Sequence, residues 1–259
     1  MRNLAITLVQ HELQWEDPAE NRAFFEQKIL EQAPQSDLIV LPEMFTTGFS
    51  MNALGNAEDP QGPTQDWMQG LAQRLDCALT GSIAVKDGVS VYNRLLFVTP
   101  DDCWHYDKRH LFRMLGEHKR YAPGNDRVIV KWRDWRIKLE VCYDLRFPVF
   151  SRNKQDYDLL LYVANWPSAR AHHWRTLLQA RAIENLTYVV GVNRIGADAN
   201  GLTYSGDSLL VDPRGQLVVD MQGRAGCEQG IADAAAMRAY HEQFPAFMDA
   251  DEFTLKGLN

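Results

Sequence analysis

The sequence predicts an α/β protein in which two sheets pack face to face behind outer helices. Short apolar runs of strand length alternate along the 259 residues with longer segments whose apolar residues recur at helical spacing. The second half loosely repeats the order of the first, which is strand, helix, strand and then hairpin. No linker, low-complexity tract or change of composition separates these elements, so we expect a single domain over residues 1–259.

The first three predicted elements are a strand, a helix and a second strand. LAITLVQ at 4–10 is β-rich, and the segment 17–33 opens with Asp17 as a candidate N-cap and Pro18 in the first helical turn. SDLIVLPE at 36–43 is a continuous apolar run ending in Pro-Glu, which is typical of a strand buried on both faces. This order indicates an α/β sheet with a crossover connection.

A helix and a hairpin follow. The segment 62–77 has apolar residues at helical spacing, and the runs 78–86 and 89–100 are strands separated by an Asp-Gly pair, which is a strong hairpin signal. The section 107–127 is rich in loops and carries little periodicity.

The second half carries the same kinds of signal, with another tight turn at Arg133-Asp134. Its predicted elements are strands at 128–132 and 135–144, a buried strand at 157–166, a helix at 170–185, and strands at 187–196, 204–212 and 216–221.

The composition argues against several classes of function. A net charge of −7 without a block of Lys and Arg argues against a nucleic-acid partner. No stretch approaches the roughly 18–20 apolar residues of a membrane span, and the apolar run at 4–9 is too short for a signal peptide, so we expect a cytoplasmic protein. The four cysteines, at 77, 103, 142 and 227, lack CxxC spacing, so we expect free thiols and no metal site.

Three chemically reactive residues stand at the ends of predicted strands. Cys142 ends one strand, Glu43 ends a fully apolar run, and Lys108 follows CWHYD. Ligands gather at the carboxyl ends of strands in open α/β sheets. Each residue also has an ordinary explanation, because a free cysteine is usually a small core residue and strand-terminal charges often face water. The occurrence of all three favours a functional site.

A cysteine, a carboxylate and a lysine in contact make a coherent catalyst. The thiolate is the nucleophile, and a carboxylate can take the thiol proton and return it to a leaving amine. The ammonium of Lys108 and the backbone N–H of Tyr143 could stabilise the oxyanion of a tetrahedral intermediate. The combination points to hydrolysis of an amide or nitrile through a thioester, with no cofactor.

These residues and their contexts, LPEMFTTGF, YDKRHLF and EVCYDLRFP, resemble the carbon–nitrogen hydrolase (nitrilase) superfamily over about residues 4–235. The resemblance implies a four-layer αββα sandwich of the nitrilase type. It assigns the general base to Glu43, the lysine to Lys108 and the nucleophile to Cys142. A second glutamate often seen in the family corresponds to Glu117 in GEHKRYAPGN, although an acid there could also lie on the loop surface.

Three further segments, CYDLRFP, ANWP and HHWRTLLQARAIEN, are most similar to the omega-amidase branch. That likeness implies hydrolysis of the terminal amide of 2-oxoglutaramate or 2-oxosuccinamate, giving the 2-oxo diacid and ammonia. The alternatives are an aliphatic amidase, a nitrilase, a carbamoylase, or a non-catalytic relative that only binds a ligand. A non-catalytic relative would be expected to have lost at least one of the three reactive residues.

The implied substrates carry a carboxylate opposite the scissile amide, and a cation must meet it. Arg146 lies four residues past the nucleophile and suits a carboxylate bidentately, but it could equally form a structural ion pair with Asp144 or another acid. Trp166 is a candidate wall of the pocket, and Thr47 and Phe49 are candidate lining residues. If Arg146 is structural, Arg170 and Arg175 are the next candidates for the carboxylate partner.

Glu140 is a second acidic residue close to the predicted nucleophile. Glu140 lies two residues before Cys142 and could share its side of the strand, where a carboxylate could raise the pKa of the thiol unless the strand alternation or a counter-ion turns it away.

The tail at 236–259, beyond the core at 4–235, predicts self-association. It would leave Phe244, Phe247 and Phe253 exposed unless a partner covers them. The family commonly pairs subunits through helices near the nucleophile, which here correspond to 146–153 and 171–185. We therefore expect a homodimer.

Overall fold

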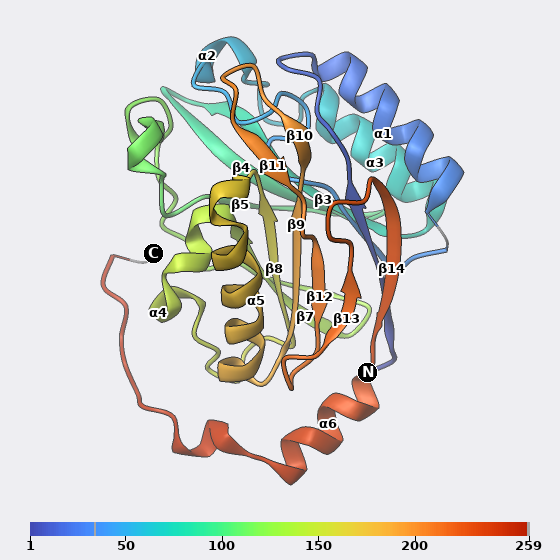
Figure 1. Ribbon diagram of the computed structural model, residues 1–259, viewed down its shortest axis with the longest axis vertical. Coiled ribbons are helices and arrows are strands. Elements are labelled where there is room, and N and C mark those ends of the chain that lie inside the picture. Colours follow the sequence, from blue (N-terminus) through green and yellow to red (C-terminus); the bar gives the residue numbers. More distant parts are fainter. Residues whose placement is uncertain (34, 258–259) are drawn as a thin grey trace.

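The computed structural model describes residues 1–33 and 35–257, and its secondary structure forms four layers in the order helices, sheet, sheet, helices (Figure 1). The first six-stranded sheet has the order β14 (Gly226–Ala232), β1 (Leu4–Gln10), β2 (Leu38–Val40), β3 (Ala78–Asp87), β4 (Ser90–Val98), β5 (Cys103–Asp107). The second has the order β13 (Leu217–Asp220), β12 (Leu209–Val211), β9 (Tyr188–Asn193), β8 (Leu159–Ala164), β7 (Trp135–Val141), β6 (Ile129–Trp132). The prediction of two sheets packed behind outer helices is confirmed.

Helices cover the outer faces of both sheets. α1 (Pro18–Gln32) and α3 (Pro63–Leu75) pack on the first sheet, and α5 (Ala171–Asn185) packs on β9 and β12 of the second. The predicted N-cap is present, since the Asp17 side chain accepts a hydrogen bond from the N–H of Glu20. The shorter helices are α2 (Ala53–Asn56), α4 (Pro148–Ser151), α6 (Ala234–Gln243) and the 3₁₀ turns η1 (Arg113–Leu115), η2 (Glu117–Lys119), η3 (Cys142–Arg146), η4 (Ser168–Arg170) and η5 (Ala246–Asp249).

The two sheets share one strand pattern. Each has three parallel strands in its middle, β1, β2 and β3 in one and β7, β8 and β9 in the other. Two strands, each antiparallel to the strand before it in the sheet, flank this group on one side, and one antiparallel strand flanks it on the other. In the second sheet that single strand is β6, which immediately precedes β7, whereas in the first it is β14, from the far end of the chain. The C-terminal part of the chain therefore completes the first sheet.

The structure corrects several predicted boundaries. The strand expected at 36–43 is confined to Leu38–Val40, after which the chain turns and Met44 has a φ of 47°. The strands expected at 187–196 and 204–212 are each broken, and a small hairpin of β10 (Ile195–Ala197) and β11 (Thr203–Ser205) lies between β9 and β12. β14 was not predicted, because GCEQGIA has two glycines and polar residues in place of a strand pattern.

The apolar inner faces of both sheets make one core. Leu4, Leu8 and Phe97 of the first sheet belong to the same buried cluster as Ile137 and Leu161 of the second. Since β4 and β5 each reverse direction, β5 runs parallel to β3, and the carboxyl ends of β2, β5, β7 and β8 lie at the same end of the sandwich. The residues that follow these four strands are therefore brought together.

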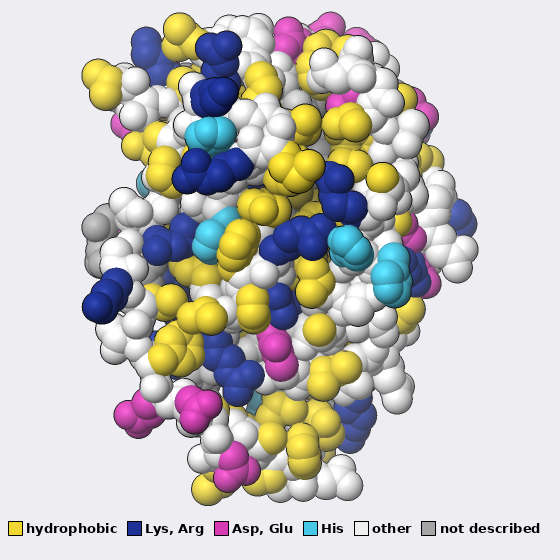
Figure 2. Space-filling view, turned by 60° about the vertical axis from the view of Figure 1, so that its left-hand side comes forward, with side chains coloured by type: hydrophobic (Ala, Val, Ile, Leu, Met, Phe, Trp, Pro, Cys, Tyr) yellow, Lys and Arg dark blue, Asp and Glu magenta, His cyan; other side chains and the backbone are white. Residues whose placement is uncertain are grey.

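Although the chain has a net charge of −7, the side of the molecule that carries α4 and the 109–120 loop presents many Lys, Arg and His side chains (Figure 2). Within residues 1–33 and 35–257, no helix is long and apolar enough to cross a membrane.

Candidate active site

Glu43 lies in the turn that follows β2, with its carboxylate fully buried. Its Oε1 accepts hydrogen bonds from Lys108 Nζ at 2.9 Å and from Asn93 Nδ2 at 2.7 Å. Its Oε2 accepts from the backbone N–H of Asn165 at 2.7 Å, and its own carbonyl accepts from Asn165 Nδ2 at 2.5 Å. These contacts tie Glu43 to β4, to the end of β5 and to the end of β8, so both sheets hold this carboxylate.

Lys108 follows β5 and is also fully buried. Its Nζ lies 2.9 Å from Glu43 and 3.0 Å from Glu117 Oε1. Burial alone would lower the pKa of the ammonium, but the carboxylates of Glu117 and Glu43 outweigh it and raise the pKa well above its usual value. Lys108 is therefore a fixed positive charge at neutral pH.

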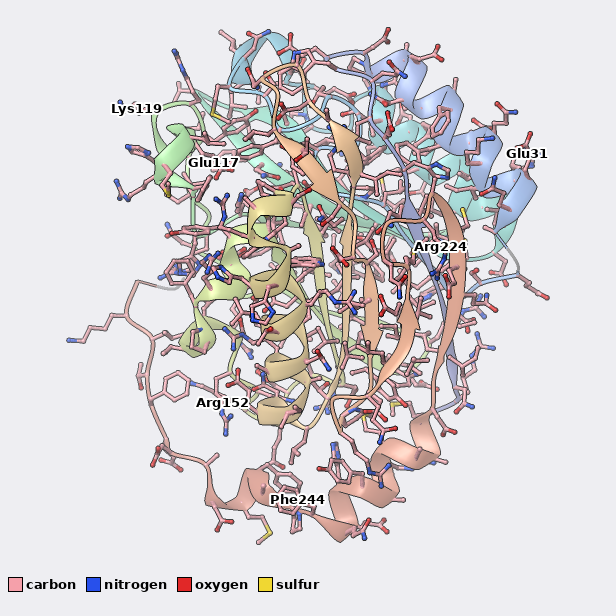
Figure 3. All side chains as sticks on the ribbon, in the orientation of Figure 1. Glu31, Glu117, Lys119, Arg152, Arg224 and Phe244 are labelled. Atoms are coloured by element: carbon pink, nitrogen blue, oxygen red, sulfur yellow. The ribbon has the colours of Figure 1, made fainter. Side chains whose placement is uncertain are left out.

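Glu117 belongs to η2 and points into the protein, whereas Lys119, two residues later, points outward (Figure 3). It accepts hydrogen bonds from Lys108 and from the N–H of Phe112. Burial raises the pKa of this carboxyl, and the ammonium of Lys108 opposes that effect. The alternative of a loop-surface acid is wrong, because Glu117 is fully buried and contacts the same ammonium as Glu43.

Cys142 stands directly after β7, at the first residue of η3, and its φ of 46° is in the left-handed region. That conformation is unfavourable for a residue with a Cβ and occurs often at functional sites. The thiol lies 3.9 Å from the carbonyl of Asn165 and close enough to the Glu43 carboxylate for that charge to act on it, and the residue is 9% exposed. Burial raises the pKa of the thiol well above its usual value, the Glu43 carboxylate adds to this, and Lys108 opposes it.

The turn at the nucleophile is held by Asp144. This buried carboxylate accepts hydrogen bonds from the N–H of Val141 at 2.9 Å, the hydroxyl of Tyr106 at 2.7 Å and the N–H of His110 at 2.9 Å. The neighbouring strand β5 and the loop after it therefore support the strained conformation of Cys142.

A cleft of about 400 Å³ opens onto the thiol. Of the predicted residues, its lining includes Phe49, Lys108, Cys142, Tyr143, Arg146 and Trp166. It also includes Asn165, Pro167, Arg170, Tyr204, Phe112 and Leu115. Asn165 directly follows β8 and Pro167 comes two residues later, so their position after an apolar run was a usable signal. Tyr204 comes from the β10–β11 hairpin, and no local pattern indicated it.

Thr47 does not line this cleft. Its side chain is buried, its hydroxyl donates to the carbonyl of Gly48 at 3.0 Å, and its own carbonyl accepts from the N–H of Glu16 at 2.9 Å. Thr47 shapes the loop after Glu43, which brings Phe49 to the wall of the cleft, and the structure gives it no contact with the cleft itself.

The side chain of Arg146 is available to a ligand. Its guanidinium stacks on the ring of Trp166, with 4.8 Å from Cζ to the ring centroid, and its Nη2 lies 3.0 Å from His173 Nδ1. Among residues 1–33 and 35–257 it has no acidic partner, and Asp144, the alternative partner, is occupied by the contacts described above. Burial lowers the pKa of Arg146, and the neighbouring charge of Arg170 lowers it further.

Arg170 and Arg175, the other two candidates for binding the substrate carboxylate, differ in position. Arg170 lines the cleft. Arg175 forms ion pairs with Asp207 at 2.9 Å and Asp220 at 2.7 Å, so it fastens α5 to the second sheet.

Glu140 does not act on the nucleophile as the sequence suggested. It forms a buried ion pair with Lys138, two residues earlier on β7, and it accepts a hydrogen bond from Ser151 Oγ at 2.7 Å. The negative charge of Glu140 is therefore paired with Lys138 and not directed at the thiol.

The chain matches the family model described as carbon–nitrogen hydrolase over residues 5–239. It is 51% identical to the omega-amidase YafV of Yersinia enterocolitica, over 98% of this chain and 100% of that protein. It is 29% identical to the 2-oxoglutaramate amidase of Bacillus subtilis, over 94% of this chain and 96% of that protein.

Solved structures give the same family. A CN-hydrolase superfamily protein of Xanthomonas campestris, whose structure has an arsenic adduct in the active site, is 49% identical. It superposes with a TM-score of 0.96 and covers 98% of this chain and 100% of its own. Nit3 of Saccharomyces cerevisiae, with a TM-score of 0.83 and 22% identity over 94% of this chain and 95% of its own, shares the fold. From its domain match and its curated relatives, the chain belongs to the carbon–nitrogen hydrolase family and is an amidase of that family.

Proposed function

We propose that this amidase uses Cys142 to hydrolyse the terminal amide of a small 2-oxo acid monoamide, 2-oxoglutaramate or 2-oxosuccinamate. The products are the 2-oxo diacid and ammonia. The observation that carries the proposal is the thiol at the cleft, next to a buried glutamate that in turn contacts a buried lysine. The similarity to omega-amidases over nearly the whole chain supports the choice of substrate.

In the first half-reaction the thiol attacks the amide carbonyl while Glu43 takes its proton. The raised pKa of the thiol keeps it neutral at rest, so the proton is transferred during the attack. The oxyanion is stabilised by the ammonium of Lys108 and the N–H of Tyr143. Glu43 then gives the proton to the amide nitrogen, the carbon–nitrogen bond breaks, and ammonia leaves a thioester on Cys142.

In the second half-reaction Glu43 takes a proton from water, which attacks the thioester carbonyl. Collapse of the second tetrahedral intermediate returns the proton to the sulfur and releases the 2-oxo diacid. Glu117 acts through Lys108, since its carboxylate lies 3.0 Å from the ammonium and helps to keep it charged and in place. None of these steps calls for a cofactor.

Arg146 is proposed to bind the carboxylate at the other end of the substrate. Its guanidinium has a fixed plane on Trp166 and lacks an acidic partner among the described residues, which is the state expected of a receptor for an anion. Phe49 and Trp166 would then enclose the short carbon chain between the two ends.

Ammonia release from 2-oxoglutaramate tests the proposal. Cys142→Ala should fold normally and lose turnover by about a thousandfold or more, because the covalent route is removed. The matched controls are Cys77→Ala, Cys103→Ala and Cys227→Ala, which should each keep the activity. Retention of more than a few per cent of activity in Cys142→Ala would show that the nucleophile is assigned wrongly.

The same assay separates the other activities of the family. Simple nitriles, N-carbamoyl amino acids and aliphatic amides without a carboxylate should be much poorer substrates than 2-oxoglutaramate. A nitrile or carbamoyl compound with the higher kcat/KM would replace the proposed substrate class and leave the thiol chemistry in place.

A further inference from the structure

The cleft contains two guanidinium groups, Arg146 and Arg170, and neither has an acidic partner among the residues that the structure describes. Many of the other arginines do have such a partner. Arg94 pairs with Asp107, Arg136 with Asp158 and Arg175 with Asp220.

Both arginines contact the same buried residue, Trp166. Arg146 lies on the face of its ring, and its indole N–H donates to the main-chain carbonyl of Arg170 at 2.8 Å. The backbone of Trp166 is fixed by the side chain of Asn193. The Asn193 amide oxygen accepts a hydrogen bond from the backbone N–H of Trp166 at 2.8 Å, and its amide nitrogen donates to the backbone carbonyl of Trp166 at 3.0 Å. The side chain of Arg170 then lies over the ring of Phe112, 5.4 Å from its centroid. The cleft therefore presents two positive charges in fixed places.

Two like charges in a half-buried cleft repel each other, and an anion placed between them relieves the repulsion. The electrostatic coupling is direct, since the charge of Arg170 is one of the causes that lower the pKa of Arg146. A single carboxylate is satisfied by one planar guanidinium through two parallel hydrogen bonds. The second guanidinium then has no acceptor unless the ligand carries another oxygen beside its carboxylate.

We propose that Arg170 recognises the 2-oxo oxygen of the substrate, next to the carboxylate that Arg146 binds. The carboxylate and the neighbouring oxo group of a 2-oxo acid present three acceptor oxygens within a short span, which two guanidinium groups can share. Arg170 is thereby the residue that makes the enzyme select a 2-oxo acid monoamide over the monoamide of a simple diacid. This inference rests on the proposed function and adds the reason for the oxo group.

The test compares three amides of the same chain length: 2-oxoglutaramate, glutaramate, which lacks the oxo group, and pentanamide, which lacks both groups. In Arg170→Met the kcat/KM ratio of 2-oxoglutaramate to glutaramate should fall about 10- to 100-fold, as expected for loss of a hydrogen bond to a charged donor. Arg170→Lys should lie between this variant and the wild type. In Arg146→Met the ratio of glutaramate to pentanamide should fall instead.

Arg113→Met is the matched control, because Arg113 is exposed on η1 and does not line the cleft. It should leave both ratios within about twofold, which excludes a general effect of removing positive charge from this side of the molecule. An unchanged ratio of 2-oxoglutaramate to glutaramate in both Arg170 variants overturns the inference, since Arg170 would then only share the carboxylate or act structurally.

A binding measurement makes failure of this inference distinguishable from failure of the proposed function. Calorimetry with Cys142→Ala should show tighter binding of 2-oxoglutarate than of glutarate, and the added change Arg170→Met should abolish that preference. A preference that survives Arg170→Met contradicts the role of Arg170 even if 2-oxoglutaramate is the substrate. Absence of any amide turnover in the wild type contradicts the proposed function instead, whatever the binding shows.

Discussion

At the scale of single residues, the charges around Cys142 set the state of the thiol. Burial and the Glu43 carboxylate disfavour the thiolate, while the ammonium of Lys108 favours it, and the first two effects prevail. A thiolate paired permanently with a cation is therefore not the resting state. The nucleophile is formed only when Glu43 can accept its proton, which couples the chemistry to the buried carboxylate.

We predict that Glu43→Gln lowers the pKa of the Cys142 thiol. The change removes a neighbouring negative charge and leaves Lys108 in place, so the thiolate forms at lower pH. Lys108→Met should have the opposite sign and raise the pKa further. The measurement is the pH dependence of iodoacetamide alkylation, followed by mass spectrometry of the peptide containing Cys142.

Glu31→Gln, at an exposed acid on α1, is the control for this titration and should leave the alkylation profile unchanged. Both active-site variants should also lose almost all turnover of 2-oxoglutaramate, because residues of one catalytic unit are not additive. An alkylation profile in Glu43→Gln that matches the wild type would mean that Glu43 does not act on the thiol.

At the scale of elements, β7 carries a buried ion pair immediately before the nucleophile. Lys138 and Glu140 point to the same side of the strand because they are two residues apart, and both are fully buried. Ser151 of α4 donates to Glu140, and its Oγ lies 2.9 Å from the hydroxyl of Tyr162 on β8. This network joins β7, β8 and α4 around the turn that holds Cys142.

We predict that Lys138→Met lowers the free energy of unfolding by about 3–5 kcal/mol, because it leaves the carboxylate of Glu140 buried without its cation. The double variant with Glu140→Gln should recover part of this loss, since the remaining group is neutral. Urea denaturation measures both values. Lys131→Met, at an exposed lysine on β6, should change the stability by no more than about 0.5 kcal/mol. An equally small effect in Lys138→Met would show that the pair is not structurally important.

At the scale of the whole molecule, the C-terminal segment leaves the body after α6 and runs along its side as an extended arm (Figure 1). Its polar contacts with the body include Lys154 Nζ to the carbonyl of Phe253 at 2.9 Å and Arg109 Nη1 to that of Gly257 at 3.2 Å. Phe244 is 52% exposed and Met248 75% exposed. Large apolar side chains exposed together are typical of a surface that meets a partner.

We predict that the protein is a homodimer in solution. Val149 and Ile183, on the two helical segments expected to pair subunits, are 55% and 54% exposed, and the arm adds the apolar groups of Phe244 and Met248. Light scattering at micromolar concentration should give twice the monomer mass. The double variant Val149→Ser, Ile183→Ser should shift the mass towards the monomer, while Leu54→Ser, at an exposed residue on α2, should not. A monomeric mass for the wild type contradicts the prediction.

Much of the fold could be predicted because its signals are local. The hairpin of β6 and β7 turns at Arg133 and Asp134, whose φ values of 49° and 67° are those of a tight two-residue turn. The helix at 170–185 and the apolar strands β1, β8 and β9 follow from periodicity within a few residues. The three reactive residue types could be found for the same reason, since each stands at the end of a predicted strand.

The remaining features depend on contacts between distant parts of the chain. β14 has no strong strand pattern and is stabilised by pairing with β1, more than 200 residues away, where Leu4 faces Ala232. The burial of Glu117, the burial of Lys138 and Glu140 and the arrival of Arg170 and Tyr204 in the cleft have the same origin. Local patterns specify where elements begin and which face is apolar. Which side chains meet depends on how the sheets pack, because burial and electrostatic pairing arise only once both sheets are in place.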